Sequence, residues 1–230
     1  QYPRHVLAIR SLSDWADGPL MAALRQDGWQ LLPSRQIYVT DHPAQDWPRR
    51  RDTRNDLRLW DKMAFSFDPL SALGPGDADR IADLYGQLYL DRYSRLNPAF
   101  TSAFIAATHA GGVIRYRGLR DAQGRLLAVV GCLTRGDVLT TPIVGYDMSL
   151  PQSAGLYRLC TVMLTKEAIA ADLRLNGSAG AAAFPLSDGQ VVVGGFVGYL
   201  DRPDKAITTV ATPGGTGAIR QALELIRLAS

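Results

Sequence analysis

Residues 137–158 read DVLTTPIVGYDMSLPQSAGLYR, and this stretch decides the fold. The β-branched and apolar residues over 138–148 predict a strand, and the apolar pattern over 156–173 predicts a long helix. A short loop with small residues at 153–155 connects the two. The sequence therefore predicts a strand that runs through a tight loop directly into a helix.

This strand–helix junction has the chemistry of an anion site. The first turn of a helix leaves backbone N–H groups without intrahelical partners, and the helix dipole adds partial positive charge there. The small residues at 153–155 let a phosphate approach the backbone, and Arg158 adds a positive charge. Many such junctions bind nothing, so the pattern taken alone leaves a purely structural interpretation open.

The residues just before this stretch predict two further strands. GVIRYRGLRD (112–121) and RLLAVVGCLTRG (125–136) are separated from each other, and from the strand at 138–148, by very short turns. Turns of this length join antiparallel neighbours. The three strands therefore form an antiparallel meander.

Helices are expected on the N-terminal side of the meander. Apolar residues recur at helical spacing over 51–62 and over 77–95, and a further helix over 97–112 ends at Gly111-Gly112. The second of these helices carries a tyrosine-rich stripe, which we interpret as core packing. Helices around a mostly antiparallel sheet predict the mixed α/β (α+β) class.

The N-terminal residues predict a strand, a helix and an extended segment. HVLAIRS (5–11) is the strand, and the helix spans 17–27 with Asp17 as its cap. Residues 29–41 are extended, and Pro33 is expected to divide them into two short strands.

The C-terminal residues predict a short strand at 174–178, a strand pair at 189–200 and 205–213, and a helix at 217–229. TPGGTGA (212–218) resembles the phosphate-binding turn of fold-type I aminotransferases. Those enzymes need a downstream lysine for the Schiff base, and residues 219–230 contain none, which excludes a complete aminotransferase. The glycine runs do not have the spacing of a P-loop.

Composition narrows the class of protein. The chain has 230 residues, 47% hydrophobic and 20% charged, as expected for a globular protein. The two cysteines lie in apolar stretches and are expected to be buried, and no Cys/His spacing suggests a metal site.

No apolar run is long enough to span a membrane and no signal peptide is evident, so we expect a cytoplasmic protein. A basic cluster over 49–58 is either a solvated surface or a binding surface for an acidic partner.

Four segments together resemble the FemAB-like branch (BioF2-like acetyltransferase domain) of the GNAT superfamily of acyltransferases. The segments are LYLDRYSRLNPAFTSAF (88–104), VIRYRGLRDAQGRLLAVVGCL (113–133), IVGYDMSLPQSAGLYRLCTVMLTKEAI (143–169) and RLNGSAGAAAF (174–184). The resemblance covers a little under half of the chain, and the basic stretch over 49–58 is similar to an Arg-rich segment before this domain in such proteins. It implies a degenerate N-terminal GNAT-like half over 1–70 and an acyltransferase domain over 71–230.

The resemblance also implies a reaction and a set of site residues. An N-acyltransferase would move an acyl group from a thioester donor, acyl-CoA or acetyl-CoA, to a small-molecule or peptide amine, with no metal. The strand at 138–148 would diverge from the strand at 174–178, and the donor would lie between them. Donor-binding residues would be Val144, Gly145, Tyr146, Gly155, Leu156, Tyr157 and Arg158.

Catalytic roles are expected for Asp147, as the base, and Ser178, with Asn176 and Arg54 as substrate-binding residues. Asp147 is as readily explained as a turn residue, and Ser178 as the cap of a following helix. Family members usually carry a basic residue just after the position of Phe184, where this chain has Pro185.

Two alternatives to the CoA-dependent enzyme stay open at this point. One is a FemAB-type transferase that uses aminoacyl-tRNA, with tRNA or a carrier protein as partner. The other is a degenerate GNAT module that keeps the fold as a binding or dimerisation unit, for instance as a homodimer. Salt-sensitive tRNA binding would favour the first alternative.

Overall fold

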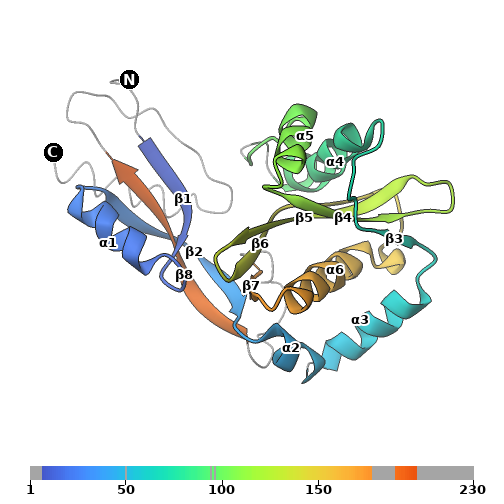
Figure 1. The fold of residues 1–230 in the computed structure, drawn as a ribbon, viewed down its shortest axis with the longest axis horizontal. Coiled ribbons are helices and arrows are strands. Elements are labelled where there is room, and N and C mark those ends of the chain that lie inside the picture. The colour runs from blue at the N-terminus through green and yellow to red at the C-terminus, as the bar shows by residue number, and fades with distance from the viewer. Residues whose placement is uncertain (1–6, 50, 94, 96, 178–189, 201–230) are drawn as a thin grey trace. The chain divides into compact units, whose positions relative to one another are not determined.

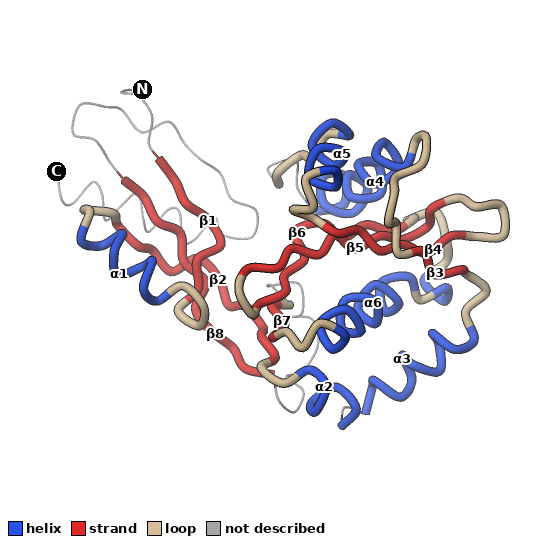
Figure 2. The backbone as a smooth tube through the Cα atoms, in the orientation of Figure 1, coloured by secondary structure: helices blue, strands red, loops and turns tan. Residues whose placement is uncertain are grey.

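Strand β6 (Val138–Tyr146) lies inside the sheet of the larger of two structural units. It pairs antiparallel with β5 (Leu126–Arg135), and β5 pairs antiparallel with β4 (Arg115–Arg120), which confirms the predicted meander. The short strand β3 (Ser66–Asp68) continues the sheet beyond β4 (Figure 2). On the other side of β6, the short strand β7 (Arg174–Asn176) runs parallel to it and pairs in turn with Val39 and Thr40.

Helices cover both faces of this sheet, as the mixed α/β prediction requires (Figure 1). On one face lie α6 (Leu156–Ala170) and α3 (Arg51–Lys62), and on the other lie α4 (Asp77–Gly86) and α5 (Ser102–Ala110). The core between α6 and the strands includes Leu127, Val130, Leu139, Leu159, Cys160 and Met163. The core under α4 and α5 includes Ile81, Leu84, Tyr85, Ile105, Tyr116 and Ile143.

Both cysteines are free and buried, as expected. Burial raises the pKa of the Cys132 and Cys160 thiols to about 12. The two side chains therefore pack as small apolar groups and stay protonated at neutral pH.

The helix predicted over 77–95 changes its geometry partway. After α4, residues Gln87–Tyr93 form a π-helix, η2. The next helix begins later than the predicted residue 97, because the Thr101 hydroxyl accepts a hydrogen bond from the Phe104 N–H (3.2 Å) and thereby caps α5 at Ser102. The π-helical turn is a feature that the apolar spacing did not predict.

Residues 41–62 connect the first strands to the sheet of the larger unit. They form the short helix α2 (Pro43–Asp46), the turn η1 (Trp47–Arg49) and then α3, whose bounds match the predicted 51–62. Leu59, Trp60 and Met63 pack against the core formed with α6. This packing places α3 in the same unit as the acyltransferase-like segments.

The smaller unit contains β1 (Leu7–Ser13), α1 (Gly18–Gln26), most of β2 (Gln30–Thr40) and most of β8 (Gln190–Leu200). Strand β8 pairs antiparallel with β1. Strand β2 is continuous, so the predicted break at Pro33 is wrong: proline has a φ compatible with an extended chain, and it removes only one donor. Asp17 precedes α1 but does not cap it, because its carboxylate accepts from the Ser13 N–H (2.8 Å) instead.

The structure describes residues 7–49, 51–93, 95, 97–177 and 190–200. Its larger unit takes in residues 39–177 of these, and Leu59, Trp60 and Met63 join α3 and the residue after it to the core of that unit. The degenerate GNAT-like half over 1–70 and the acyltransferase domain over 71–230 stay predictions. The predicted strand at 205–213, the helix at 217–229, the motif at 212–218 and Ser178 lie outside the described residues.

Candidate functional site

Strand β6 has an edge that is paired over only part of its length. Val138, Leu139 and Thr140 are in register with β7, and β7 ends there at Asn176. At the next two residues, Thr141 and Pro142, the register with β5 shifts, which marks a β-bulge. Among the described residues, no strand pairs with β6 on this side beyond the bulge.

The bulge also changes which backbone groups point to that edge. The Asp147 N–H donates to the Leu127 carbonyl of β5 (2.7 Å), so alternation along the strand turns Gly145 toward β5 as well. The N–H groups of Val144 and Tyr146 therefore point away from β5, to the open edge. An extra residue that redirects a strand and ends its pairing is typical of bulges near functional sites.

Helix α6 begins directly beside the end of this strand. Gly155 has a positive φ of 66° and serves as the N-cap residue, which positions the first-turn backbone of α6, starting at Leu156, where the sequence predicted an anion site. A side chain at Gly155 would lie 2.5 Å from Leu59 of α3. The glycine is therefore required both by its backbone conformation and by the close approach of α3.

Arg158, in the first turn of α6, already has a partner. Its Nε lies 2.6 Å from Oδ1 of Asp56 in α3. The carboxylate of Asp56 adds negative charge close to the helix start, and an incoming phosphate would compete with it for Arg158. The charged residue of the predicted anion site is thus already paired with a carboxylate of α3.

Gly145 has a packing role that its position on β6 explains. A Cβ at this residue would lie 2.6 Å from the backbone of Leu84 and Tyr85 in α4. The missing side chain therefore lets α4 lie directly on β6. Of the three predicted donor-binding residues on β6, Val144 and Tyr146 therefore direct backbone groups to the open edge, whereas Gly145 faces β5 with its backbone and α4 with its Cα.

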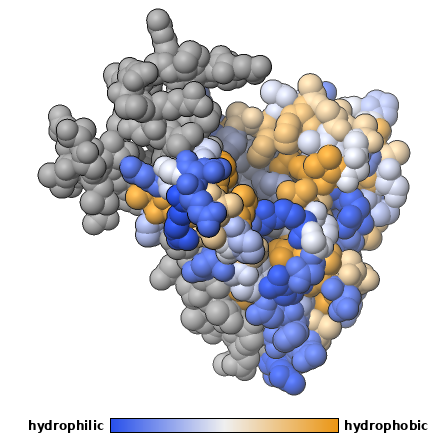
Figure 3. Space-filling model, turned by 60° about the vertical axis from the view of Figure 1, so that its left-hand side comes forward, coloured by the Kyte–Doolittle hydropathy of each residue, from blue (hydrophilic) through white to orange (hydrophobic). Residues whose placement is uncertain are grey.

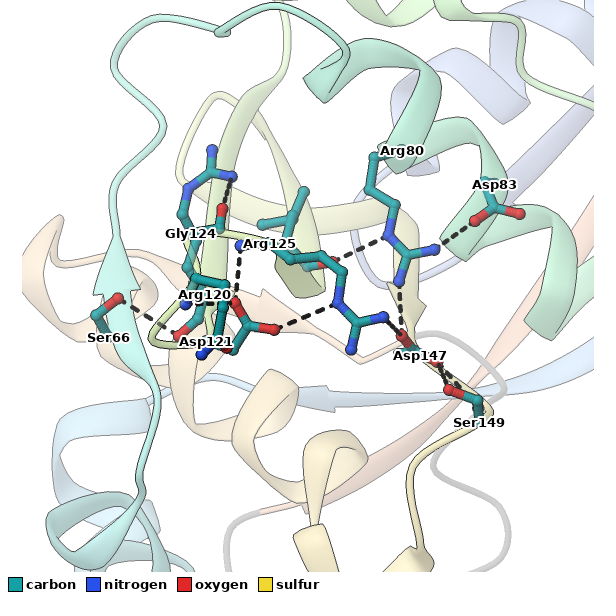
Figure 4. A network of polar contacts seen from close by, with 11 residues as sticks. Ser66, Arg80, Asp83, Arg120, Asp121, Gly124, Arg125, Asp147 and Ser149 are labelled. Atoms are coloured by element: carbon teal, nitrogen blue, oxygen red, sulfur yellow. Dashed lines mark hydrogen bonds and ion pairs between the residues drawn. The ribbon is translucent and has the colours of Figure 1, made fainter.

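Asp147 lies at the centre of a network of arginines (Figure 4). Its carboxylate is 4% exposed, lies 2.7 Å from Nη2 of Arg80 and 3.6 Å from Nη1 of Arg125, and accepts from the N–H and hydroxyl of Ser149 at 3.0 and 2.5 Å. Burial acts to raise the pKa of Asp147, but the hydrogen bonds from Ser149 and the charge of Arg80 outweigh it and hold the pKa below its usual value.

A carboxylate with a lowered pKa and two cationic partners is a poor proton acceptor at neutral pH. The geometry therefore favours the second interpretation of Asp147, a turn residue that fixes the segment after β6. Its partner Arg80 extends this role, since it also donates to Asp83 and to the Leu126 carbonyl.

The other predicted site residues are spread over two elements. Asn176 is half-buried at the end of β7, in register with Thr140 of β6 and Val39 of β2, so it lies where the paired part of β6 ends. Arg54 is exposed on α3, most of whose residues are charged. The face of the molecule drawn in Figure 3 carries both hydrophilic and hydrophobic side chains. The structure does not bring Arg54 to the open edge of β6 through any contact that it describes.

Tyrosines lie in pairs on η2 and at the end of β6, and only the second pair, Tyr146 and Tyr157, belongs to the predicted site residues. Tyr89 and Tyr93 of η2 have ring centroids 6.0 Å apart, and Tyr146 of β6 and Tyr157 of α6 have theirs 6.3 Å apart. Tyr93 is 64% exposed and Tyr157 is 37% exposed. The tyrosine-rich stripe in the sequence was the available signal; its interpretation as core packing holds for the buried Tyr85 and for Tyr89, which packs against the same core, but not for Tyr93.

At least one phenol of each pair has a raised pKa. Burial raises the pKa of Tyr157, and Tyr93 and Tyr146 raise it further. Burial likewise raises the pKa of Tyr89 to about 12, with contributions from Tyr85, Tyr157 and Tyr93. Tyr89 and Tyr157 are therefore protonated at neutral pH.

Metal binding and membrane crossing find no support in the described part of the chain. Within it, no group of three or more His, Cys, Asp or Glu side chains is placed to hold a metal ion. None of the helices described there combines the length and the apolar character that a bilayer crossing requires.

Comparisons with known proteins bear on the family and on the fold. Residues 48–184 match the family described as the acetyltransferase (GNAT) domain. No match was found among proteins of curated function. The fold is similar to that of L-PGS from Bacillus licheniformis, with a TM-score of 0.59, 9% identity and coverage of 96% of this chain and 72% of that one.

Two further solved structures share the fold. The C-terminal domain of a putative lysylphosphatidylglycerol synthetase from Agrobacterium fabrum has a TM-score of 0.59 at 11% identity, with 96% of this chain and 72% of that one covered. FemX has a TM-score of 0.56 at 9% identity, with coverages of 84% and 71%. The chain therefore belongs to the GNAT acetyltransferase domain family, as an acyltransferase with the fold of the FemAB-like branch.

Proposed function

We propose that this acyltransferase moves an acyl group from a thioester donor, acyl-CoA or acetyl-CoA, to an amine, beside the open edge of β6. The observation that carries the proposal is the bulge at Thr141 and Pro142, where pairing with β7 ends. Beyond it, the N–H groups of Val144 and Tyr146 face the open edge and α6 begins next to it at Leu156.

These backbone groups suit the two ends of such a donor. The donor's amide groups would pair with the backbone of Val144 and Tyr146, as an added strand does. Its phosphates would lie at the first turn of α6, where Leu156, Tyr157 and Arg158 supply N–H groups and positive charge. Most of the acceleration would then come from holding donor and amine together and from backbone donors directed at the developing oxyanion.

The roles of side chains follow from their places along the chain. Asn176, at the end of β7, is proposed to orient the donor carbonyl, and Ser178 to protonate the leaving thiolate. Asp147 is proposed to hold the turn after β6 in place through Arg80 and Arg125, and not to accept the proton.

A second donor class, aminoacyl-tRNA, is favoured by one observation. Asp56 and Leu59 of α3 both lie against the start of α6, where the phosphates of CoA would bind. A donor whose phosphates bind elsewhere would not compete with Asp56 for Arg158 and would not need the space beside Leu59. The basic surface of α3, which includes Arg54 and Arg58, would then contact the nucleic acid.

The thermal midpoint with acetyl-CoA, longer acyl-CoAs and free CoA separates the two donors. A ligand that binds the native state raises the midpoint with its concentration. We expect such a rise, and a larger one in Asp56→Asn, which frees Arg158 for a phosphate. Asp61→Asn, an exposed change on the same helix, is the matched control and should behave as the unmodified chain.

The absence of a shift with every CoA species, in both the unmodified chain and Asp56→Asn, would exclude the CoA donor. Binding of aminoacyl-tRNA would then be measured at several salt concentrations. Affinity that falls steeply with salt and is reduced by Arg54→Gln would support the second donor class.

A further inference from the structure

The side chain of Gln87 joins the end of α4 to the segment that follows β6. Its Oε1 accepts a hydrogen bond from the Met148 N–H (3.3 Å), and its Nε2 donates to Oδ2 of Asp83 (3.0 Å). A backbone N–H can only donate and a carboxylate can only accept, so the two partners fix which way the amide points. Gln87 therefore uses both ends of its amide, and neither a carboxylate nor an apolar side chain could take its place.

Gln87 acts together with two other residues of the same helical face. Arg80, Asp83 and Gln87 are spaced i, i+3 and i+7, which places them on one face of α4 where it continues into the π-helix η2. Asp83 also accepts from Arg80 (2.5 Å), and Arg80 donates to Oδ2 of Asp147 (2.7 Å) (Figure 4). One face of this helix therefore holds two consecutive residues after β6, Asp147 by its side chain and Met148 by its backbone.

The segment held in this way lies between the two parts of the proposed donor site. The Asp147 N–H bonds to a carbonyl of β5, and the next N–H, that of Met148, bonds to Gln87 instead. From there the chain turns toward the start of α6 at Leu156. A shift of Met148 therefore changes the spacing between the Tyr146 N–H, at the open edge, and the first turn of α6.

We propose that Gln87 is a positioning residue of this acyltransferase, which holds Met148 and thereby sets the spacing between the open edge of β6 and the start of α6. The inference rests on the proposed function in one respect, that the donor binds to both of these elements. Gln87 acts on the donor through Met148 and takes no part in proton transfer. Its loss weakens donor binding, because the donor's amide groups and its phosphates then no longer meet their partners at the same time.

A set of variants separates this role from a general effect on the fold. Gln87→Met removes both hydrogen bonds at nearly constant size, and Gln87→Glu keeps the acceptor but places a second carboxylate beside Asp83. The double variant, Asp83→Asn with Gln87→Glu, exchanges the amide and the carboxylate, so both hydrogen bonds can form again and the net charge of the chain stays the same. Gln123→Met, exposed in the turn between β4 and β5, is the matched control.

The affinity for acetyl-CoA, measured by calorimetry, is the first readout. We expect it to fall about tenfold in Gln87→Met and Gln87→Glu, to return to within about twofold in the double variant, and to stay unchanged in Gln123→Met. Amide hydrogen exchange followed by NMR is the second readout. Exchange at Met148 should be faster in Gln87→Met and slow again in the double variant, while the Asp147 N–H, which bonds to β5, keeps its protection.

Equal affinity for acetyl-CoA in all of these proteins would overturn the inference, and so would a loss of affinity that the double variant does not restore. Unchanged exchange at Met148 in Gln87→Met would overturn it as well. If the unmodified chain binds no acetyl-CoA, the CoA donor fails, and the preference for aminoacyl-tRNA over uncharged tRNA is measured on the same variants. Loss of that preference in Gln87→Met and its return in the double variant would support the role of Gln87, and an unaltered preference would refute it.

Discussion

Two arginines on one helical segment have opposite surroundings. Arg80 of α4 is largely buried and donates to Asp83, Asp147 and the Leu126 carbonyl (Figure 4). Arg92, three turns further along in η2, is exposed beside tyrosines and has no carboxylate partner among the described residues. Arg80 therefore has its counter-charges within the chain, and a comparison of the two arginines separates the effect of a buried ion pair from that of an exposed, unpaired guanidinium.

The carboxylate shared by Arg80 and Arg125 should carry the largest effect on stability. Asp147→Asn removes the charge that both guanidinium groups face, so we expect the free energy of unfolding to fall by about 3 kcal/mol. Urea denaturation measures this. The control is Asp83→Asn, which removes the other partner of Arg80 at a site that is 50% exposed and should cost less than about 1 kcal/mol.

Acyl transfer by Asp147→Asn, assayed well below its unfolding temperature, completes this test. A structural Asp147 predicts a turnover number close to that of the unmodified chain. A loss of about a thousandfold or more with unchanged stability would instead identify Asp147 as the general base.

The stabilisation of the fold by Asp147 should depend partly on pH. The folded-state pKa of Asp147 lies below the unfolded value, so its contribution is fully present above about pH 4 and is lost as pH falls through the folded pKa. Denaturation at a series of pH values from 7 to 2 should show that the unmodified chain loses more stability than Asp147→Asn over the acid range. Parallel curves for the two proteins would contradict the pairing with Arg80.

Sequence reasoning predicted the elements of the fold better than the site. The bounds of α3, the meander of β4, β5 and β6, and the start of α6 all follow from local spacing and turns. The bulge at 141–142 depends on the register with β5, which no local pattern specifies. It is also the feature that ends pairing with β7 and opens the edge.

The roles of Asp147 and the tyrosines could not be predicted for a similar reason. Arg80 lies 67 residues before Asp147, so the sequence left its two interpretations equally open. The tyrosine stripe has helical spacing throughout, but the buried face ends near Leu88, and Tyr93 lies beyond it in a π-helical turn. Such turns often occur at functional sites, but the apolar pattern does not predict this one.

Arg92→Gln should have little effect on the fold. The free energy of unfolding is expected to change by less than about 0.5 kcal/mol, because the side chain is exposed and pairs with no carboxylate among the described residues. Urea denaturation measures this, and a loss comparable to that of Asp147→Asn would contradict the contrast between the two arginines.

The exposed ion pair of Arg95 tests whether pairing alone, or the burial of the pair, stabilises the fold. It lies one turn after Arg92, is 88% exposed, and has Asp91 as its partner at 3.8 Å. An exposed pair of this spacing contributes about 0.3–0.5 kcal/mol and is screened by salt, so Arg95→Gln should shift the unfolding midpoint barely at all, and less at high salt than at low salt. A cost comparable to that of Asp147→Asn would mean that any paired arginine of this helix stabilises the fold. In that case pairing alone, whether buried or exposed, would explain why Arg80 stabilises the fold and Arg92 does not. The small cost that we expect would instead attribute the stabilisation by Arg80 to the burial of its counter-charge.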